Sequence, residues 1–152
     1  KGIRDMVRRS TINGVVFEHI PVEDVRVAYE RIEQDLHKIR KKSYADWIPA
    51  DIYAALKVGN ADLFIGYEKD YYAGFIITSF IQDAGGQPTL FLWATYQNPK
   101  FNHKDNGFIF LDKLAEECNV SAIEFHSSRK GWTKAAKRHG YEPVTQVYRK
   151  EM

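Results

Sequence analysis

The residues best suited to bind an anion lie in one loop and the helix predicted after it, PKFNHKDNGFIFLDKL, residues 99–114. The Asn106-Gly107 pair marks the point where the loop would turn into the helix. The first backbone N–H groups of a helix have no partner within it and point outward, so they can bind a phosphate group. The sequence therefore offers a phosphate site at this helix start, although an Asn-Gly pair alone is also a common turn signal.

Charged side chains in the loop would act on such a site in opposite directions. Asp105 would bring a negative charge next to a bound phosphate and weaken binding through repulsion. Lys100, His103 and Lys104 lie in the same loop and could compensate that charge. In the alternative interpretation, the Asp105 carboxylate caps the helix N-terminus and no phosphate binds. The sequence leaves both open, a weakened phosphate site and a simple helix cap.

The first third of the chain is dominated by apolar residues at helical spacing. They recur at steps of three and four residues, which predicts a long amphipathic helix over about residues 22 to 41. Residues 14–21 are predicted to form a short strand before it, and a second helix should begin near Pro49 and end at Gly59. Residues 1–13 show no clear period and are predicted to be a partly ordered, flexible basic arm.

Three strands joined by short turns are predicted next. They cover residues 61–68, 71–81 and 89–97, and their order in the chain predicts an antiparallel meander. The loop with the candidate phosphate site follows the last of them, and a helix over residues 107–118 follows the loop.

The remaining chain predicts a strand over residues 120–128, a basic helix over 130–140 and a final strand over 141–152. The first of these should lie parallel to the strand at 89–97, because a helix crosses over between them. The complete predicted order is β, α, α, β, β, β, α, β, α, β in a single α/β domain of 152 residues.

Composition excludes several classes of protein. Apolar residues make up 44% and charged residues 28%, which is typical of a globular chain. The lone Cys118 excludes an internal disulfide and a cysteine metal cluster and fits a reducing compartment, so we expect a cytoplasmic protein. The histidines show no metal-ligand spacing, so no metal is predicted, and no apolar run is long enough for a membrane span.

Positive charge clusters at residues 4–9 and 129–138, although the net charge is only +2. The second cluster contains Lys134, Lys137, Arg138 and Trp132, which could contact nucleic acid or a ligand phosphate. A basic surface helix is most often simply solvated, so nucleic-acid binding is the weakest of the functions considered.

The predicted order of elements resembles the GNAT (Gcn5-related N-acetyltransferase) superfamily over nearly the whole chain from Gly14 onward. The resemblance implies a mixed, mostly antiparallel twisted sheet with helices on both faces, and acetyl-CoA or a related acyl-CoA as the donor. Members carry a loop motif PxxRxxGxG that binds the CoA pyrophosphate. Pro99 and Gly107 match this motif, whereas Asn102 stands at the Arg or Gln position and Asp105 at the first Gly.

The resemblance also implies which residues would bind the donor. The strand before the loop would pair its backbone with the pantetheine arm of CoA. The expected donor-binding residues are Trp93, Ala94, Thr95, Tyr96 and Gln97 on that strand and Asn102, His103, Lys104, Asp105, Asn106, Gly107 and Phe108 in the loop and helix start.

The usual catalytic residues of the family are missing. Ala136 stands where many members have a tyrosine acid, and the strand at 89–97 contains no carboxylate that could act as a base. Tyr96, Glu124 and His126 would lie near the cleft where the two parallel strands of the GNAT fold separate, and they are the substitute catalytic candidates. His126 could act as a base, although a histidine at such a position is more often a strand residue bound to a backbone carbonyl.

Two functions are therefore carried forward. One is an N-acyltransferase that moves an acetyl group from acetyl-CoA to a primary amine of an unknown acceptor, and the resemblance allows a homodimer, because many family members dimerise. The other is a catalytically inactive GNAT-fold structural or interaction protein, similar to degenerate members among bacteriophage virion and accessory proteins.

Overall fold

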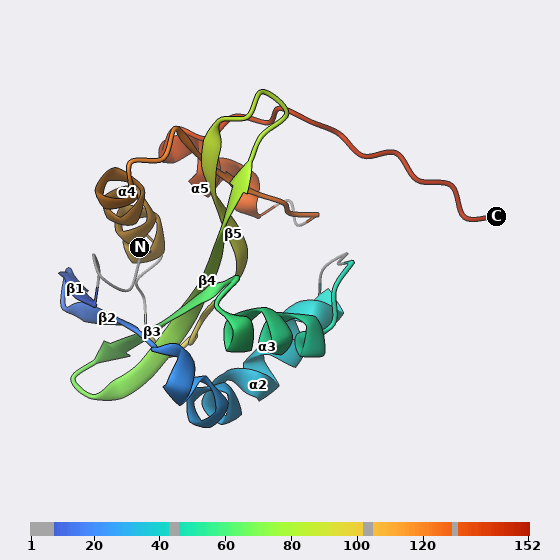
Figure 1. Cartoon of the computed structure of the whole chain (residues 1–152). Helices are drawn as coiled ribbons and strands as arrows, with labels where there is room; N and C mark the ends of the chain where they lie inside the picture. Colours follow the sequence, from blue (N-terminus) through green and yellow to red (C-terminus); the bar gives the residue numbers. More distant parts are fainter. Residues whose placement is uncertain (1–7, 43–45, 102–104, 129–130) are drawn as a thin grey trace.

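In the computed structural model of the chain, the described residues form one sheet of six strands in the order β1-β2-β3-β4-β5-β6 (Figure 1). The structure describes residues 8–42, 46–101, 105–128 and 131–152. The strands are β1 (Arg9–Ile12), β2 (Val15–His19), β3 (Asp62–Glu68), β4 (Tyr71–Gln82), β5 (Pro88–Gln97) and β6 (Ala122–Phe125). Neighbouring strands are antiparallel from β1 to β5, and β6 is parallel to β5 as predicted.

Helices cover both faces of this sheet. A short 3-10 helix, η1 (Val22–Asp24), leads into α2 (Val25–Lys42), and α3 (Pro49–Val58) packs beside α2 on one face (Figure 1). On the other face lies α4 (Asn106–Cys118), and α5 (Trp132–Arg138) follows β6. The mixed sheet, mostly antiparallel with helices on both faces, confirms the predicted fold class.

The alternation of side chains along the strands explains why the sheet has an apolar core on each of its two faces. In β3, Leu63 and Ile65 pack with the apolar stripe of α2 and α3, whereas Phe64 between them packs with α4. Successive side chains of a strand point to opposite faces, so a strand with apolar residues at every position is buried on both sides. The Phe64 and Phe110 rings meet edge to face at 5.0 Å and fix α4 on its face.

The first strand replaces the predicted basic arm. Residues 9–12 pair with β2 through a two-residue turn at Asn13 and Gly14, whose φ angles are +48° and +86°. Positive φ at both positions is what a type I′ hairpin turn requires, and Asn-Gly is its preferred pair. Ser10 and Ile12 point inward and are buried. The predicted arm is therefore wrong for residues 9–12, while residues 1–7 lie outside the described part of the chain.

The predicted final strand is also wrong for the single chain. Residues 141–152 have no regular secondary structure, and residues 142–152 are all exposed. Pro143 has no backbone N–H to donate to a sheet. Val144 and Val147 are three residues apart, so a strand would place them on opposite faces and leave neither face fully apolar.

The remaining elements agree with the sequence prediction apart from small shifts at their ends. Gly59 ends α3 in the left-handed conformation, with φ of +80°, and its N–H bonds to the last carbonyls of the helix. Of the helices that the structure describes, none is both long and apolar enough to cross a membrane.

Candidate functional site

The sheet opens where β5 and β6 separate. Residues 89–92 of β5 pair with β6, and β5 then continues to Gln97 with no strand on that edge within the described ranges. On its other edge, Ala94 pairs with Ile77 and Leu92 with Thr78, so Trp93 is an extra residue that forms a bulge. A bulge bends a strand and increases its local twist. Between residues 93 and 97, the backbone N–H and C=O groups that face this edge therefore have no strand partner in the described part of the chain.

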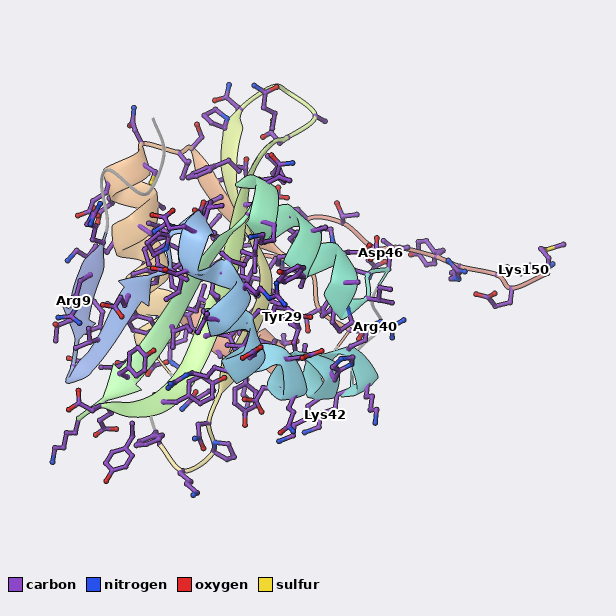
Figure 2. The ribbon with its side chains drawn as sticks, turned by 60° about the horizontal axis from the view of Figure 1, so that its bottom comes forward. Arg9, Tyr29, Arg40, Lys42, Asp46 and Lys150 are labelled. Atoms are coloured by element: carbon purple, nitrogen blue, oxygen red, sulfur yellow. The ribbon has the colours of Figure 1, made fainter. Side chains whose placement is uncertain are left out.

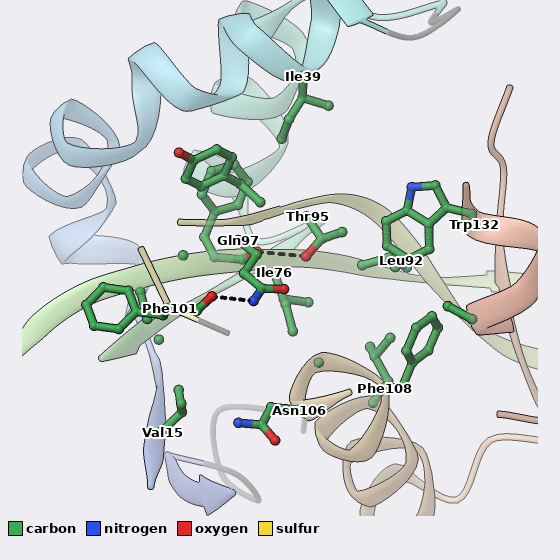
Figure 3. Close-up of a pocket in the computed structure, with 18 of the residues that line it drawn as sticks. Val15, Ile39, Ile76, Leu92, Thr95, Gln97, Phe101, Asn106, Phe108 and Trp132 are labelled. Atoms are coloured by element: carbon green, nitrogen blue, oxygen red, sulfur yellow. Dashed lines mark hydrogen bonds between the residues drawn. The ribbon is translucent and has the colours of Figure 1, made fainter. Parts of the chain in front are cut away.

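A cavity of about 790 Å³ lies against this free edge (Figure 3). Its wall is built by β5, by the start of α4, by α5 and by the end of α2, and its lining includes Thr95, Gln97, Asn106, Trp132 and Ile39. This volume is in the range of small-molecule sites. In Figure 3, Trp132 and Phe108 face the cavity from α5 and α4, opposite Ile39 of α2.

The start of α4 carries a buried amide at the cavity wall. Asn106 is 5% exposed, and its side-chain oxygen accepts a hydrogen bond of 3.1 Å from the Asn13 amide. The Asn106 Nδ2 is buried and has no protein partner among the described residues. An unpaired buried donor is costly, so an acceptor group in the cavity would relieve it.

Gly107 leaves room beside that amide. Among the described residues, a Cβ atom built on Gly107 would meet only the Ile76 Cδ1, at 3.7 Å, which is an ordinary contact. The fold itself therefore does not require glycine here. The missing side chain instead keeps the backbone at the helix start open to the cavity, which Gly107 lines.

Asp105 is held by α5 and does not cap α4. Its carboxylate makes no side-chain cap bond to the helix. It accepts hydrogen bonds from His139 Nε2 at 2.8 Å and from Arg138 at 2.9 Å. These bonds, from His139 first and then Arg138, lower the pKa of the Asp105 carboxyl. The predicted carboxylate cap is thus wrong, and the negative charge of Asp105 is matched by α5.

Of the three residues predicted to compensate the Asp105 charge, only Lys100 lies in the described part of the chain. His103 and Lys104, like Asn102, lie outside the described residues. Lys100 donates its backbone N–H to the Asn98 side chain, within a turn that Phe101 closes onto Asn98. The Gln97 amide donates to the Phe101 carbonyl at 2.8 Å, so the end of β5 is tied to the start of the loop (Figure 3).

A carboxylate and two tyrosines meet beside the cavity. The Tyr72 hydroxyl donates to Asp35 at 2.9 Å, and the Tyr72 ring lies parallel to that of Tyr96 at 6.5 Å. Tyr96 lines the cavity together with Lys38, whose ammonium is 3.4 Å from Asp35. Burial, and after it the Asp35 charge, raises the pKa of Tyr96, so its hydroxyl stays protonated at neutral pH.

The other two catalytic candidates do not line the cavity. Glu124 stands opposite Phe91, within the paired part of β5 and β6. His126 follows β6 directly, is exposed, and meets the Phe91 ring edge to face at 5.0 Å. The structure thus brings only Tyr96 of the three to the cavity wall, and catalytic roles for Glu124 and His126 stay predictions.

Sequence reasoning missed Asp35, and one signal could have revealed it. Asp35 is three residues after Ile32 and four before Ile39, which places a carboxylate on the inward face of α2. Its side chain is only 13% exposed. Tyr141 was also missed: its hydroxyl is buried without a partner in the described chain, and burial raises its pKa to about 12.

Comparison with known proteins gives no match by sequence, either to a family model or to a curated protein. Similar solved structures are nevertheless found. An aminoglycoside acetyltransferase from an uncultured soil metagenomic sample, in complex with trehalose, has a TM-score of 0.64 at 11% identity, covering 92% of this chain and 98% of that one.

Two further structures are similar to the same extent. An acetyltransferase from Clostridium acetobutylicum solved with acetyl-CoA has a TM-score of 0.64 at 14% identity, over 90% of this chain and 96% of that one. A ribosomal-protein-alanine N-acetyltransferase from Brucella melitensis has a TM-score of 0.64 at 13% identity, over 91% and 99%. At such identities the likeness concerns the fold, and it confirms the predicted resemblance: this chain has the fold of the GNAT acetyltransferases.

Proposed function

We propose that the protein is an N-acyltransferase that transfers an acetyl group from acetyl-CoA to a primary amine of an acceptor. The observation that carries the proposal is the cavity that combines three donor-binding features. These are the free edge of β5 at residues 93–97, the open start of α4 and the buried Asn106 Nδ2, which has no partner among the described residues. One ligand with an amide-containing arm and a phosphate would satisfy all three.

The residues present fit such a donor. The free backbone of Trp93, Ala94, Thr95, Tyr96 and Gln97 would pair with the amides of the pantetheine arm. The backbone N–H groups at Asn106, Gly107 and Phe108 and the Asn106 amide would bind the pyrophosphate. Arg138, which also lines the cavity, adds a cation there. Asp105 opposes the phosphate less than its charge alone suggests, because it is paired with α5.

The chemistry requires two proton movements. The amine nitrogen forms a bond to the acyl carbon, the carbon–sulfur bond breaks, the nitrogen loses a proton and the sulfur gains one. Tyr96 is a protonated hydroxyl on the donor strand and would give its proton to the sulfur. Asp35 is the carboxylate that would take the proton lost by the nitrogen of the neutral amine, with Glu124 and His126 as the alternatives predicted from the sequence.

The donor site is tested by calorimetry with acetyl-CoA. We expect binding to the unmodified protein and at least about tenfold weaker binding to Gly107→Ala, because the added methyl group occupies the open helix start while the fold accommodates it. Gly85→Ala, in the exposed turn between β4 and β5, is the matched control and should bind normally. Absence of binding at millimolar acetyl-CoA would refute the donor site.

Acyl transfer is tested separately by thiol release from acetyl-CoA with a panel of polyamines and peptides. Tyr96→Phe should bind acetyl-CoA normally and lose most of the transfer rate, since the ring remains and the proton donor is gone. An equal rate in this variant would remove Tyr96 from the mechanism.

The second candidate is a catalytically inactive GNAT-fold interaction protein. It is favoured by Ala136, which lies in α5 at the position where the usual acid of the family would stand. Binding of acetyl-CoA without transfer to any amine of the panel would support this alternative.

A further inference from the structure

We infer that the acceptor is a small primary amine that also carries a carboxylate, and that Lys42 of α2 selects it by binding this carboxylate. The inference rests on the proposed acyl transfer and adds the chemical class of the acceptor. Three observations carry it: the sign of the charges that line the cavity, their places on its walls and the spacing of side chains along α2.

The charged side chains that line the cavity are all cations in the described part of the chain. They are Lys38, Lys42 and Arg138, and the lining includes no aspartate or glutamate from the described residues. A cleft lined by charges of one sign raises the local concentration of ligands of the opposite sign. The cavity therefore favours anionic ligands and disfavours an acceptor that brings a second positive charge.

The three cations lie on two different walls. Arg138 is bonded to Asp105, directly before α4, at 2.9 Å, so it stands beside the proposed phosphate site. Lys38 and Lys42 belong to α2, which packs on the face of the sheet opposite to α4 (Figure 1). The α2 lysines are therefore placed across the sheet from the proposed phosphate site, where the acceptor rather than the donor supplies the anion.

One face of α2 presents these lysines to the cavity. Lys38, Ile39 and Lys42 all line it. They follow Asp35 at steps of three, four and seven residues, and side chains at these steps share one face of a helix. Arg40, near the same end of α2, is used differently, because it donates to a backbone carbonyl that precedes α3 (Figure 2).

The charges of this helix face sum to a single positive charge. The Lys38 ammonium is 3.4 Å from the Asp35 carboxylate, so these two charges offset each other. Lys42 is exposed, and its ammonium has no ion-pair partner among the described residues. One positive charge is complementary to a carboxylate, which carries one negative charge, rather than to a doubly charged phosphate.

The spacing along α2 indicates how far the carboxylate lies from the amine. Asp35, which would take the proton of the amine, and Lys42 are seven residues apart, or about 10 Å along the helix axis. Helical side chains lean toward the N-terminus, which brings the Lys42 ammonium closer to Asp35. Several methylene groups between the amine and the carboxylate would span the remaining distance, whereas the two groups of an α-amino acid are too close together.

Three amines on the same methylene chain isolate the effect of charge. ε-Aminocaproate, its amide and cadaverine carry a negative, a neutral and a positive group at the far end. The measured quantity is kcat/KM for thiol release from acetyl-CoA. We expect ε-aminocaproate to exceed its amide about fivefold, which is the upper end for an exposed ion pair, and cadaverine to react most slowly.

Substitutions at Lys42 test whether this residue sets the preference. Lys42→Gln should make the carboxylate and the amide about equal, and Lys42→Glu should reverse their order, because the new charge repels the carboxylate. Lys41→Gln is the matched control: Lys41 is exposed on the same helix end and is not among the lining residues, so the preference should stay. Calorimetry should give Lys42→Gln the acetyl-CoA affinity of the unmodified protein within about twofold, as expected for a residue of the acceptor wall.

The outcomes separate this inference from the proposed function. Equal rates for the carboxylate and the amide, or a preference that Lys42→Gln leaves unchanged, would overturn the inference and leave acyl transfer intact. Weaker acetyl-CoA binding in Lys42→Gln with the preference unchanged would assign Lys42 to the donor and overturn it as well. If no amine is acetylated, calorimetry with ε-aminocaproate on the protein saturated with CoA decides. Binding tighter than that of the amide and dependent on Lys42 would support the inference although acyl transfer fails, and equal or absent binding would overturn it.

Discussion

The hydrogen bond between Tyr72 and Asp35 should be measurable in the stability of the protein. Tyr72→Phe removes only the hydroxyl that donates to Asp35 at 2.9 Å. A hydrogen bond to a charged group typically contributes about 1.5–3 kcal/mol. The Asp35 side chain is 13% exposed, so solvent screens it little, but Lys38 remains at 3.4 Å as a second partner. We therefore expect Tyr72→Phe to lower the free energy of unfolding by about 1.5 kcal/mol, the lower end of this range.

Tyr71→Phe is the matched control for this substitution. This substitution also removes a tyrosine hydroxyl, one residue earlier in β4, from a side chain that is 69% exposed. Its effect on the free energy of unfolding should stay within about 0.5 kcal/mol. Urea denaturation of both variants and of the unmodified protein, with equal m values, gives the difference directly.

The pH dependence of this bond has a definite sign. Burial, and after it the bond to Asp35, raises the pKa of Tyr72 well above the ordinary value. A group with a raised pKa contributes its stability fully below its unfolded pKa of about 10 and loses it only as the pH rises through the folded value. The difference between Tyr72→Phe and the unmodified protein should thus be constant through neutral pH.

A double-mutant cycle with Asp35→Asn decides whether the two residues interact. If they do, the loss in the double variant should be smaller than the sum of the single losses by about 1 kcal/mol. Equal stability losses for Tyr72→Phe and Tyr71→Phe, or additive losses in the cycle, would refute the reasoning.

Three further outcomes are expected. Gly74→Ala should destabilise the fold by about 3 kcal/mol or more in thermal unfolding, because its Cβ would lie 2.0 Å from a backbone oxygen of β5; wild-type stability would contradict the strand geometry. Asp105→Asn should be less stable than the unmodified protein at neutral pH, and the stabilities of the two should converge in acid. A carboxyl group whose pKa is lowered by folding stabilises the fold above its unfolded pKa of about 4, and this contribution is lost as the pH falls through the lowered value. Urea midpoints compared across pH check this, and a difference that persists in acid would contradict it. Cys118 should react with iodoacetamide more slowly than free cysteine at pH 8, because burial raises the pKa of its thiol, and an equal rate would contradict that burial.

The middle of the fold was predictable because its signals are local. In β3 and β4 most central positions are apolar and short turns separate the strands, so the antiparallel meander follows from spacing alone. The parallel β5–β6 pair followed from the helix between them. The four residues of β1 were too few for a visible period, although Asn13-Gly14 is the turn signal that identifies the hairpin.

The site was predictable only in part because its charges are paired across the fold. The loop and the donor strand can be read from one stretch of sequence. The pairing of Asp105 with Arg138 and His139 joins residues 33 and 34 positions apart, through a tertiary contact between α4 and α5 that spacing does not reveal. Asp35 was overlooked for the opposite reason, because a charged residue on an amphipathic helix is usually assigned to solvent.

The pairing of Asp105 with Arg138 and His139 changes what the departure of the loop from the GNAT motif means. Glycine at position 105 would leave Arg138 and His139 without their carboxylate, and α5 has no buried residue to hold it in place. What remains is ring packing, chiefly His139 on Phe108 at 4.5 Å and Trp132 on the same ring at 5.7 Å. Asp105 therefore adds a negative charge beside the helix start and, by the same bonds, holds the cation of Arg138 at the cavity wall. The two effects oppose each other, so the acidic residue is compatible with a donor site that the sequence alone would judge damaged.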